Sequence, residues 1–298
     1  MQFLYMINDR LLENQRLPEK REPLRFWPSE ASAFVDGKMW GWGCHRKIFW
    51  SANGMLNTNR SPITSRRSQI MGKAFEEKEI ELLIDHPNIT EVVSNFKLKG
   101  TLGNGIDISG EIDSIIRMGD LWQGIEYKTG HGKYYRDEVM GTTYQSGFPK
   151  DNYIMQVMLY LELLKTHPDL KGKISEFEIY CMDRDKCETV SHMLSLSHDG
   201  YPVINGEIFE KINIQDIIDR FTVIKYNIES DILPRGDFTS YYSIREVKEM
   251  YMRKKIAKWQ KLRWEKAGYG CDIQCAYCNY LHRCQHANGM RSGFKELK

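Results

Sequence analysis

The order of the predicted helices and strands indicates an α/β fold. An amphipathic helix is predicted over residues 71–84, three successive strands over 90–128, a second helix over 153–164 and another strand over 174–184. The second helix is apolar on nearly every face, so it belongs in the core. A helix, three strands, a helix and a strand in this order predict a sheet flanked by helices.

The last two of the three strands are predicted to form a β-hairpin around the turn signal Gly119-Asp120. Asp113 lies near the start of the first hairpin strand, and Glu126 and Lys128 end the second. Side chains alternate between the two faces of a strand, so Glu126 and Lys128 share a face. We therefore expect two carboxylates and one ammonium group to converge at the edge of the sheet.

Two neighbouring carboxylates repel each other unless a cation offsets their charge, and Mg²⁺ is a cation that prefers oxygen ligands. A lysine beside such a cation can orient a water molecule or offset the charge that develops on a phosphate under attack. The pattern predicts metal-dependent cleavage of phosphodiester bonds. The alternative is a surface hairpin with an ordinary cross-strand Glu/Lys pair, because so short a motif is common.

Both predicted helices carry polar residues that point to a site. Gln156 and Tyr160 are four residues apart on one face of the buried helix, and a buried amide and hydroxyl need hydrogen-bonding partners. An active site that faces this helix would provide them. On the earlier helix, Glu76, Glu77 and Glu79 are expected to face mainly solvent, with one of them available as a further metal ligand.

Composition sets broad limits on the function. The chain has 298 residues, of which 41% are hydrophobic and 28% charged, so it can bury a sizeable core. The net charge is only +2, so nucleic-acid binding would depend on local basic patches. No run approaches the ~18 apolar residues of a membrane span, and the N-terminus lacks the order of a signal peptide. We expect a soluble, cytoplasmic protein with no membrane contact.

The cysteines are unevenly distributed. Four of the seven lie between Cys271 and Cys284, which favours metal ligation in a reducing compartment over a disulfide framework. Thiolates bind soft or borderline cations, and close spacing lowers the entropic cost of gathering them. Cys44 stands alone far upstream, where buried packing is the simplest reading.

Three groups of residues resemble the successive motifs of the RecB-like branch of the PD-(D/E)XK nucleases: Asp113, Glu126-Tyr127-Lys128 and Gln156-x-x-x-Tyr160. Gly72 followed four residues later by Glu76 is similar to the first-helix motif of that branch, where histidine is commoner than glutamate. The resemblance covers residues 28–195 and the C-terminal cysteine segment. It implies a restriction-endonuclease-like core, with a mixed central sheet flanked by helices.

The resemblance also implies roles for these residues. The ligands of a catalytic Mg²⁺ or Mn²⁺ ion would be the following groups: the side chains of Glu76, Asp113 and Glu126 and the carbonyl of Tyr127. Lys128 would orient the attacking water, while Gln156 and Tyr160 would brace the site and touch the strand. The implied substrate is DNA that is single-stranded or has free ends, and the implied action is exonucleolytic or end-trimming.

The spacing Cys275-x-x-Cys278-x5-Cys284 resembles the tail of the iron-sulfur RecB-like nucleases. That group includes the CRISPR-associated adaptation nuclease, the AddB subunit of helicase-nucleases and exonuclease V. Its fourth ligand lies just before the nuclease core, where Cys44 is followed two residues later by Arg46. The implied cofactor is a [4Fe-4S] cluster. The resemblance also implies a helicase or integrase partner and a role in recombination, DNA repair or CRISPR adaptation.

Three alternatives stay open at this point. Cys271 can replace Cys44 and form a self-contained zinc site with the other three tail cysteines. The protein can be a non-catalytic zinc or iron-sulfur module that binds nucleic acid. The substrate can also be RNA.

Composition and motifs together predict four segments. These are an N-terminal arm (1–27), a nuclease core with the upstream cluster-ligand segment (28–199), a helical insertion (200–266) and a cysteine-rich iron-sulfur segment (267–298). The insertion is predicted from helical periodicity over 212–233 and 243–268.

Overall fold

The computed structural model describes residues 19–58, 63–142 and 145–288. The chain forms two compact units, which we call the sheet unit and the cysteine unit. Their segments are Glu22–Gly43 and Ser68–Tyr226 for the sheet unit, and Met1–Arg21, Cys44–Arg67 and Asn227–Lys298 for the cysteine unit. The predicted boundaries at 27/28, 199/200 and 266/267 stay predictions.

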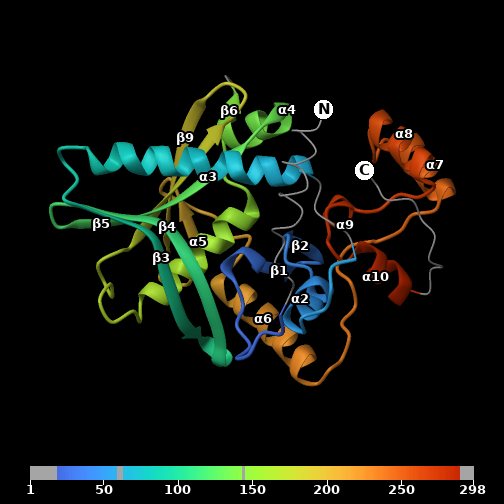
Figure 1. The fold of residues 1–298 in the computed structure, drawn as a ribbon, viewed down its shortest axis with the longest axis horizontal. Coiled ribbons are helices and arrows are strands. Elements are labelled where there is room, and N and C mark those ends of the chain that lie inside the picture. Colours follow the sequence, from blue (N-terminus) through green and yellow to red (C-terminus); the bar gives the residue numbers. More distant parts are fainter. Residues whose placement is uncertain (1–18, 59–62, 143–144, 289–298) are drawn as a thin grey trace, which may run out of the picture. The chain divides into compact units, whose positions relative to one another are not determined.

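A seven-stranded sheet forms the centre of the sheet unit (Figure 1). Strands β5 and β8 pair in parallel and every other pair in this sheet is antiparallel, so the sheet is mixed, as predicted. In spatial order the strands are β11 (Glu207–Ile208), β10 (Pro202–Ile204), β9 (Glu188–Leu196), β8 (Glu176–Asp183), β5 (Leu121–Gly130), β4 (Ile106–Met118) and β3 (Glu91–Leu102).

The predicted β-hairpin is confirmed. Met118 of β4 pairs with Leu121 of β5, so Gly119 and Asp120 form a two-residue turn. Gly119 has a φ of +62°, in the region that glycine adopts without steric cost. A short 3₁₀ turn, η2 (Gly103–Gly105), joins β3 to β4.

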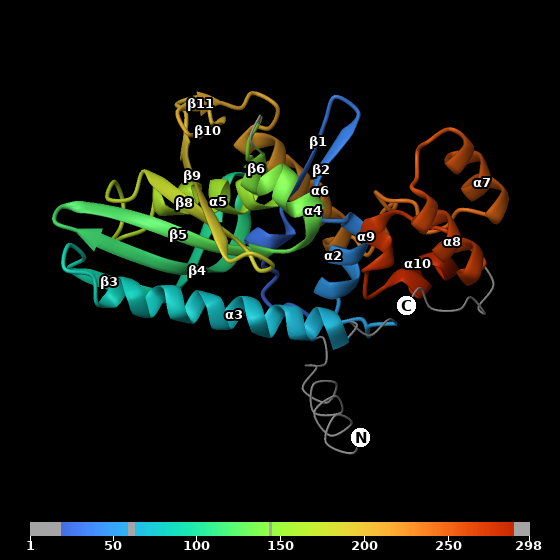
Figure 2. The ribbon, with the colours of Figure 1, turned by 90° about the horizontal axis from the view of Figure 1, so that it is seen from above.

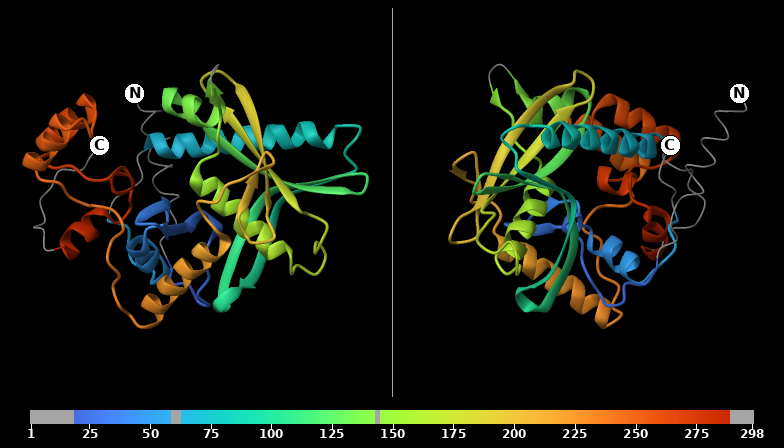
Figure 3. Two further views of the ribbon diagram at one scale, coloured as in Figure 1. Left: turned by 180° about the vertical axis from the view of Figure 1, so that it is seen from behind. Right: turned by 60° about the vertical axis from the view of Figure 1, so that its left-hand side comes forward.

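The two predicted helices lie on opposite faces of the sheet. Helix α3 (Ile63–Ile84) runs along the face seen in Figure 1 and below β4 and β5 in Figure 2, and α5 (Asp151–Leu164) lies on the face seen from behind in Figure 3. Helix α5 contributes nine buried residues to the core, as its apolar sequence predicted. Helix α3 begins eight residues earlier than predicted, because extending a formed helix through polar, solvated residues costs little.

Several short elements precede α3. Residues 28–30 form a single 3₁₀ turn, η1 (Pro28–Glu30). A small hairpin of β1 (Ser32–Val35) and β2 (Lys38–Gly41) follows it. The remaining short elements of the sheet unit are α4 (Gly132–Tyr135), the π-helical turn η3 (Arg136–Met140), β6 (Gly141–Thr142) and β7 (Gln145–Ser146).

The segment 200–266, predicted as a helical insertion, begins with two short strands. Strands β10 and β11 extend the central sheet, and only then does α6 (Ile214–Glu229) begin. The apolar face of α6 is buried through Ile217, Phe221 and Ile224. These strands are only three and two residues long, so they leave little periodic signal in the sequence.

The cysteine unit is helical where it is described. Its helices are α2 (His45–Ala52), α7 (Ile244–Met252), α8 (Lys258–Ala267), α9 (Ile273–Ala276) and α10 (Leu281–Ala287). The helical periodicity over 243–268 is interrupted, and Lys254 adopts a φ of +55° between α7 and α8. The break lets Val247, Ile256 and Trp264 pack together in one buried cluster. Among the described residues, no helix combines the length and the apolar character needed to cross a membrane.

Candidate active site

Asp113 lies where strands β4 and β5 separate. The two strands are paired from the turn as far as Ser114 and Ile125, and no pairing of β4 with β5 continues beyond that point. The amide of Tyr127 therefore has no partner on β4, and the Asp113 side chain takes this place: Tyr127 N donates to Asp113 Oδ2 at 2.8 Å. The divergence of two strands thus positions the first predicted carboxylate.

Glu126 is the centre of the polar cluster. Its side chain is 1% exposed, and its Oε1 atom accepts hydrogen bonds from Lys128 Nζ and from Gln156 Nε2, the latter at 2.6 Å. Lys128 Nζ also lies 3.4 Å from Gln156 Oε1. The structure therefore brings together Glu126, Lys128 and Gln156, which come from β5 and from the buried helix α5.

Tyr160 connects this cluster to the backbone of β4. Its hydroxyl accepts a hydrogen bond from Gln156 Nε2 at 2.9 Å and donates one to the carbonyl of Glu111 at 2.7 Å. Tyr160 is 2% exposed. A buried hydroxyl that is satisfied on both sides fixes the orientation of the Gln156 amide, and Gln156 in turn orients the Glu126 carboxylate.

Glu76 reaches the same region from helix α3. It lines a small cavity together with Tyr127 and Lys128. Burial raises the pKa of Asp113 and of Glu126, and the charge of Glu76 adds to this effect. Its Oε1 atom accepts a hydrogen bond from Lys73 Nζ at 2.5 Å, and Lys73 also donates to Asn95 Oδ1 at 2.8 Å. Lys73 is a neighbour of the site that the sequence reasoning missed, although its position three residues before Glu76 on a helix is a usable signal.

Asp113 and Glu126 hold their protons more tightly than usual, because the pKa of each carboxyl is raised. Burial, together with the charge of Glu126, raises the pKa of Asp113 to about 8. Burial also raises the pKa of Glu126. Burial alone would lower the pKa of Lys128, but the Glu126 and Asp113 carboxylates outweigh it and raise that pKa to about 12. The lysine therefore stays charged, while the carboxyls lack enough positive charge around them.

The chemical types of the donor groups, as distinct from their arrangement, suit a hard divalent cation. Asp113, Glu126 and Glu76 offer carboxylate oxygens, which Mg²⁺ and Mn²⁺ prefer. The Oε2 atom of Glu126 is buried and has no hydrogen-bond partner among the described residues. A bound cation would supply both the missing partner for this oxygen and the missing positive charge.

The assignment of metal ligands nevertheless stays a prediction. Within residues 19–58, 63–142 and 145–288, no group of three or more His, Cys, Asp or Glu side chains is arranged to hold a metal ion. The predicted role of the Tyr127 carbonyl is likewise a prediction, since the contact that the structure gives to the Tyr127 backbone is the donation from its amide to Asp113.

The predicted cluster cysteines lie in the cysteine unit. Burial raises the pKa of the Cys275 thiol, and the neighbouring Cys271, Cys44, Cys278 and Cys284 raise it further. All seven cysteines are free of disulfide bonds. Arg46 Nη1 donates to Cys284 Sγ at 3.3 Å, and Tyr280 N donates to Cys278 Sγ at 3.4 Å. Cys271 and Cys275 lie in one buried cluster, and Cys278 packs against another that contains Cys284. Among the described residues, no three cysteines are arranged to hold a metal ion.

The fold and the site together define a class of protein. A mixed sheet with one parallel pair at its centre, covered by a helix on each face, is the architecture of restriction-endonuclease-like nucleases, and the acidic cluster with its lysine lies on the strands of this sheet. Comparison with protein families gives the same answer: residues 50–285 match the PD-(D/E)XK nuclease superfamily. The chain belongs to this superfamily, whose nucleases use divalent metals such as Mg²⁺ or Mn²⁺.

Other comparisons give more distant similarity. The structure is similar to a crystal structure described as SSO0001, with 13% sequence identity, a TM-score of 0.45 and 94% of each chain covered. It is also similar to an alkaline exonuclease (LHK-Exo) from Laribacter hongkongensis, with 12% identity, a TM-score of 0.42, and 83% of this chain and 100% of that chain covered. A search of curated proteins gives no significant match.

Proposed function

We propose that this protein is a metal-dependent nuclease that hydrolyses phosphodiester bonds in DNA, with single-stranded DNA or free DNA ends as substrate and exonucleolytic or end-trimming action. The observation that supports the proposal most directly is the hydrogen bonding of the Glu126 carboxylate. One of its buried oxygens is held by Lys128 and Gln156, and the other has no partner in the described part of the chain. A carboxylate held in this way is built to bind a cation.

The proposed roles follow from the contacts. The carboxylates of Asp113 and Glu126, with that of Glu76, would hold the divalent ion, and the ion would supply Lewis acidity towards the phosphoryl oxygens. Lys128 orients the attacking water and offsets the negative charge on the phosphate. Gln156 keeps Glu126 in place, and Tyr160 keeps Gln156 in place through its bond to the Glu111 carbonyl. The water attacks the phosphorus in line with the departing sugar oxygen.

The proposed function is tested by digestion of end-labelled single-stranded DNA. We expect cleavage with Mg²⁺ or Mn²⁺ and none after addition of a chelator, because the carboxyl cluster lacks positive charge without the ion. Parallel reactions with duplex DNA and with RNA of the same sequence define the substrate. If the protein binds the strand but does not cleave it with either Mg²⁺ or Mn²⁺, it is a non-catalytic binding module and the proposal is wrong.

We further propose that Cys44, Cys275, Cys278 and Cys284 hold a [4Fe-4S] cluster. Thiolates are the ligands of such clusters, and the backbone and arginine N–H groups that donate to the Cys278 and Cys284 sulfurs resemble the hydrogen bonds that tune them. Burial, with Asp237 adding to it, raises the pKa of the Cys44 thiol. Burial also raises the pKa of Cys278, to about 11. Without a metal these thiols hold their protons, and a bound metal would displace them.

Purification without oxygen, followed by iron, sulfide and zinc analysis, tests the cluster. We expect a coloured protein that contains iron, and we expect Cys44→Ser to lose the iron while Cys271→Ser keeps it. The exposed Cys187 provides the matched control, because Cys187→Ser leaves the five cysteines of the cysteine unit unchanged. A colourless zinc protein that loses its metal in Cys271→Ser but retains it in Cys44→Ser would establish the zinc site in place of the cluster.

A further inference from the structure

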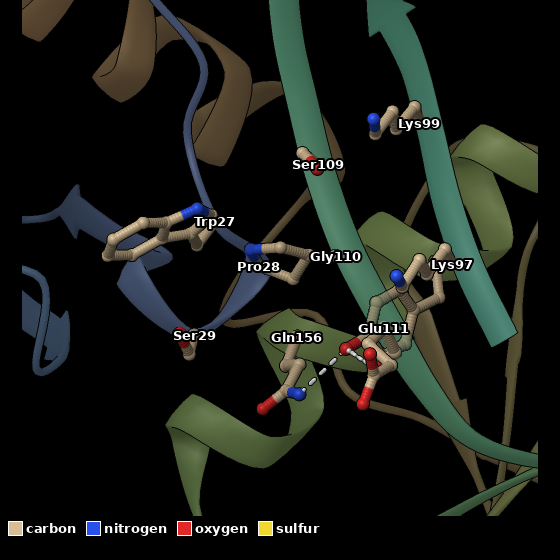
Figure 4. A pocket seen from close by; sticks show the side chains of 10 residues that line it. Trp27, Pro28, Ser29, Lys97, Lys99, Ser109, Gly110, Glu111 and Gln156 are labelled. Atoms are coloured by element: carbon tan, nitrogen blue, oxygen red, sulfur yellow. Dashed lines mark hydrogen bonds between the residues drawn. The ribbon is translucent and has the colours of Figure 1, made fainter. Parts of the chain in front are cut away.

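A pocket of about 410 Å³ opens in the sheet unit beside the candidate active site (Figure 4). This volume falls within the range of sites for small organic groups. The lining side chains that matter here are Trp27, Lys97, Lys99, Glu111, Gln156 and Tyr160. Two of them, Gln156 and Tyr160, also brace Glu126, and Gln156 Nε2 lies 2.6 Å from Glu126 Oε1. The pocket and the candidate active site therefore share a wall.

Trp27 is a large aromatic side chain that stays exposed although its backbone is held. The preceding residue, Phe26, forms two backbone hydrogen bonds of 2.9 Å with β4, from Phe26 N to Asp107 O and from Ser109 N to Phe26 O. The following residue, Pro28, is buried and begins the turn η1. Trp27 as a whole residue is nevertheless 47% exposed. A rigidly attached aromatic surface of this kind loses little entropy when a ligand stacks on it.

The floor of the pocket depends on the absence of a side chain at Gly110. A Cβ atom at this position would lie 2.8 Å from Pro28 Cγ and 3.0 Å from Tyr160 Cε1. Both distances are too short for ordinary contact, so glycine lets the turn at Pro28 and the ring of Tyr160 approach β4 closely. This close approach places Trp27 next to the residues that brace the active site.

Two positive charges lie on the wall formed by β3. Lys97 and Lys99 are alternate residues of one strand, so they share a face, and both side chains are exposed. Figure 4 shows both ammonium groups directed to the side of the strand on which Trp27 lies. In the register of β3 and β4, Lys97 pairs with Glu111 and Lys99 pairs with Ser109. Glu111 therefore adds a hydrogen-bond acceptor beside the two lysines.

We propose that this pocket binds one unpaired nucleotide of the substrate strand, next to the phosphate that is cleaved. Its base stacks on Trp27, and its flanking phosphates contact Lys97 and Lys99. An aromatic face beside lysines is the combination that binds single strands, because every base has a face to stack and every linkage has a phosphate. This inference rests on the proposed function and extends it, since a base in the interior of a duplex has no free face to offer. The substrate must therefore be unpaired at this nucleotide.

The test is a double-mutant cycle between protein and DNA, measured as binding of a labelled single-stranded oligonucleotide in EDTA. We expect Trp27→Ala to weaken binding by about 5- to 100-fold, and Trp27→Phe to restore most of the loss. A single abasic residue, moved along the strand, should weaken binding to the wild type at one position by the same factor. That abasic residue should have no further effect on Trp27→Ala, because the stacking contact is already lost.

Matched controls separate the pocket from general effects. Trp42 is also 47% exposed and lies outside the pocket, so Trp42→Ala should bind like the wild type. Lys97→Ala and Lys99→Ala should each reduce the dependence of affinity on salt, whereas Lys171→Ala, at an exposed lysine outside the lining, should not.

The outcomes distinguish this inference from the proposed function. If the wild type cleaves DNA but Trp27→Ala binds with unchanged affinity, the pocket assignment is wrong and the nuclease assignment stands. If binding depends on Trp27 and on one base but no metal supports cleavage, the pocket stands and the nuclease assignment is wrong. A wild type that does not bind the oligonucleotide refutes the pocket.

Discussion

Lys128→Met and Asp113→Asn are each expected to abolish cleavage while leaving affinity for single-stranded DNA nearly unchanged. Lys128 is the cation next to buried Glu126, and removal of such a group from a site that stabilises developing charge lowers rates by about 100- to 1,000-fold. Asp113→Asn removes one of the two carboxylates proposed to hold the divalent ion, yet keeps an oxygen that can accept the bond from Tyr127 N. Both replacements nearly preserve side-chain volume.

The measurement pairs two assays on the same preparations: digestion of a labelled strand with Mn²⁺, and binding of that strand in EDTA. Lys186→Met is the matched control, because Lys186 is an exposed lysine that also pairs with a glutamate, Glu188, at 3.7 Å. It should cleave and bind like the wild type. Loss of binding in parallel with loss of cleavage would contradict the proposed roles, because it would place these groups in strand binding or in folding.

Asp113→Asn is also expected to make the metal-free protein more stable than the wild type, increasingly so as the pH rises from about 4 to 8. In the unfolded chain this carboxyl has its ordinary pKa of 3.8, and in the folded protein burial and Glu126 raise the pKa to about 8. Between these values the folded state binds the extra proton, so the free energy of unfolding of the wild type falls as the pH rises. The full effect, above the folded pKa, is on the order of 6 kcal/mol at most.

Urea unfolding in EDTA at several pH values measures this difference. Asp120→Asn, in the exposed turn of the same hairpin, should follow the wild type at every pH. Adding Mg²⁺ at pH 8 should stabilise the wild type, since the ion binds the folded state and offsets the carboxylates, and should affect Asp113→Asn much less. Parallel stability curves for the wild type and Asp113→Asn would show that Asp113 is not in a strained acidic cluster.

Much of the core is predictable from the sequence because its signals are local. The hairpin is marked by two apolar runs around Gly119-Asp120, and α5 by an apolar stretch too long for a strand. The less regular parts of the fold are not predictable from the sequence, and the reason is also physical. The aromatic segment that forms β1, β2 and α2 has no clear period, and the periodicity over 243–268 hides a break that tertiary packing of Val247, Ile256 and Trp264 imposes.

The candidate site likewise contains some residues that the sequence predicts and others that only the structure reveals. Residue type and spacing relate Asp113, Glu126 and Lys128 on the hairpin. They separately relate Gln156 and Tyr160 on one helix face. The resemblance to the RecB-like nucleases joins the two sets into one site. Lys73 and Asn95 are found only in the structure, where a lysine of α3 bridges a glutamate of its own helix and a residue of β3.

By itself, the sequence determined the α/β class, the hairpin and the identity of the charged residues on it, because each of these depends on neighbours within a few residues. Only the tertiary structure decided that β4 and β5 separate at Asp113, which gives its carboxylate the free amide of Tyr127. Only the tertiary structure also brought Trp27 next to Lys97 and Gln156. Such contacts join segments far apart in the chain, and their geometry is set by how strands diverge and helices pack.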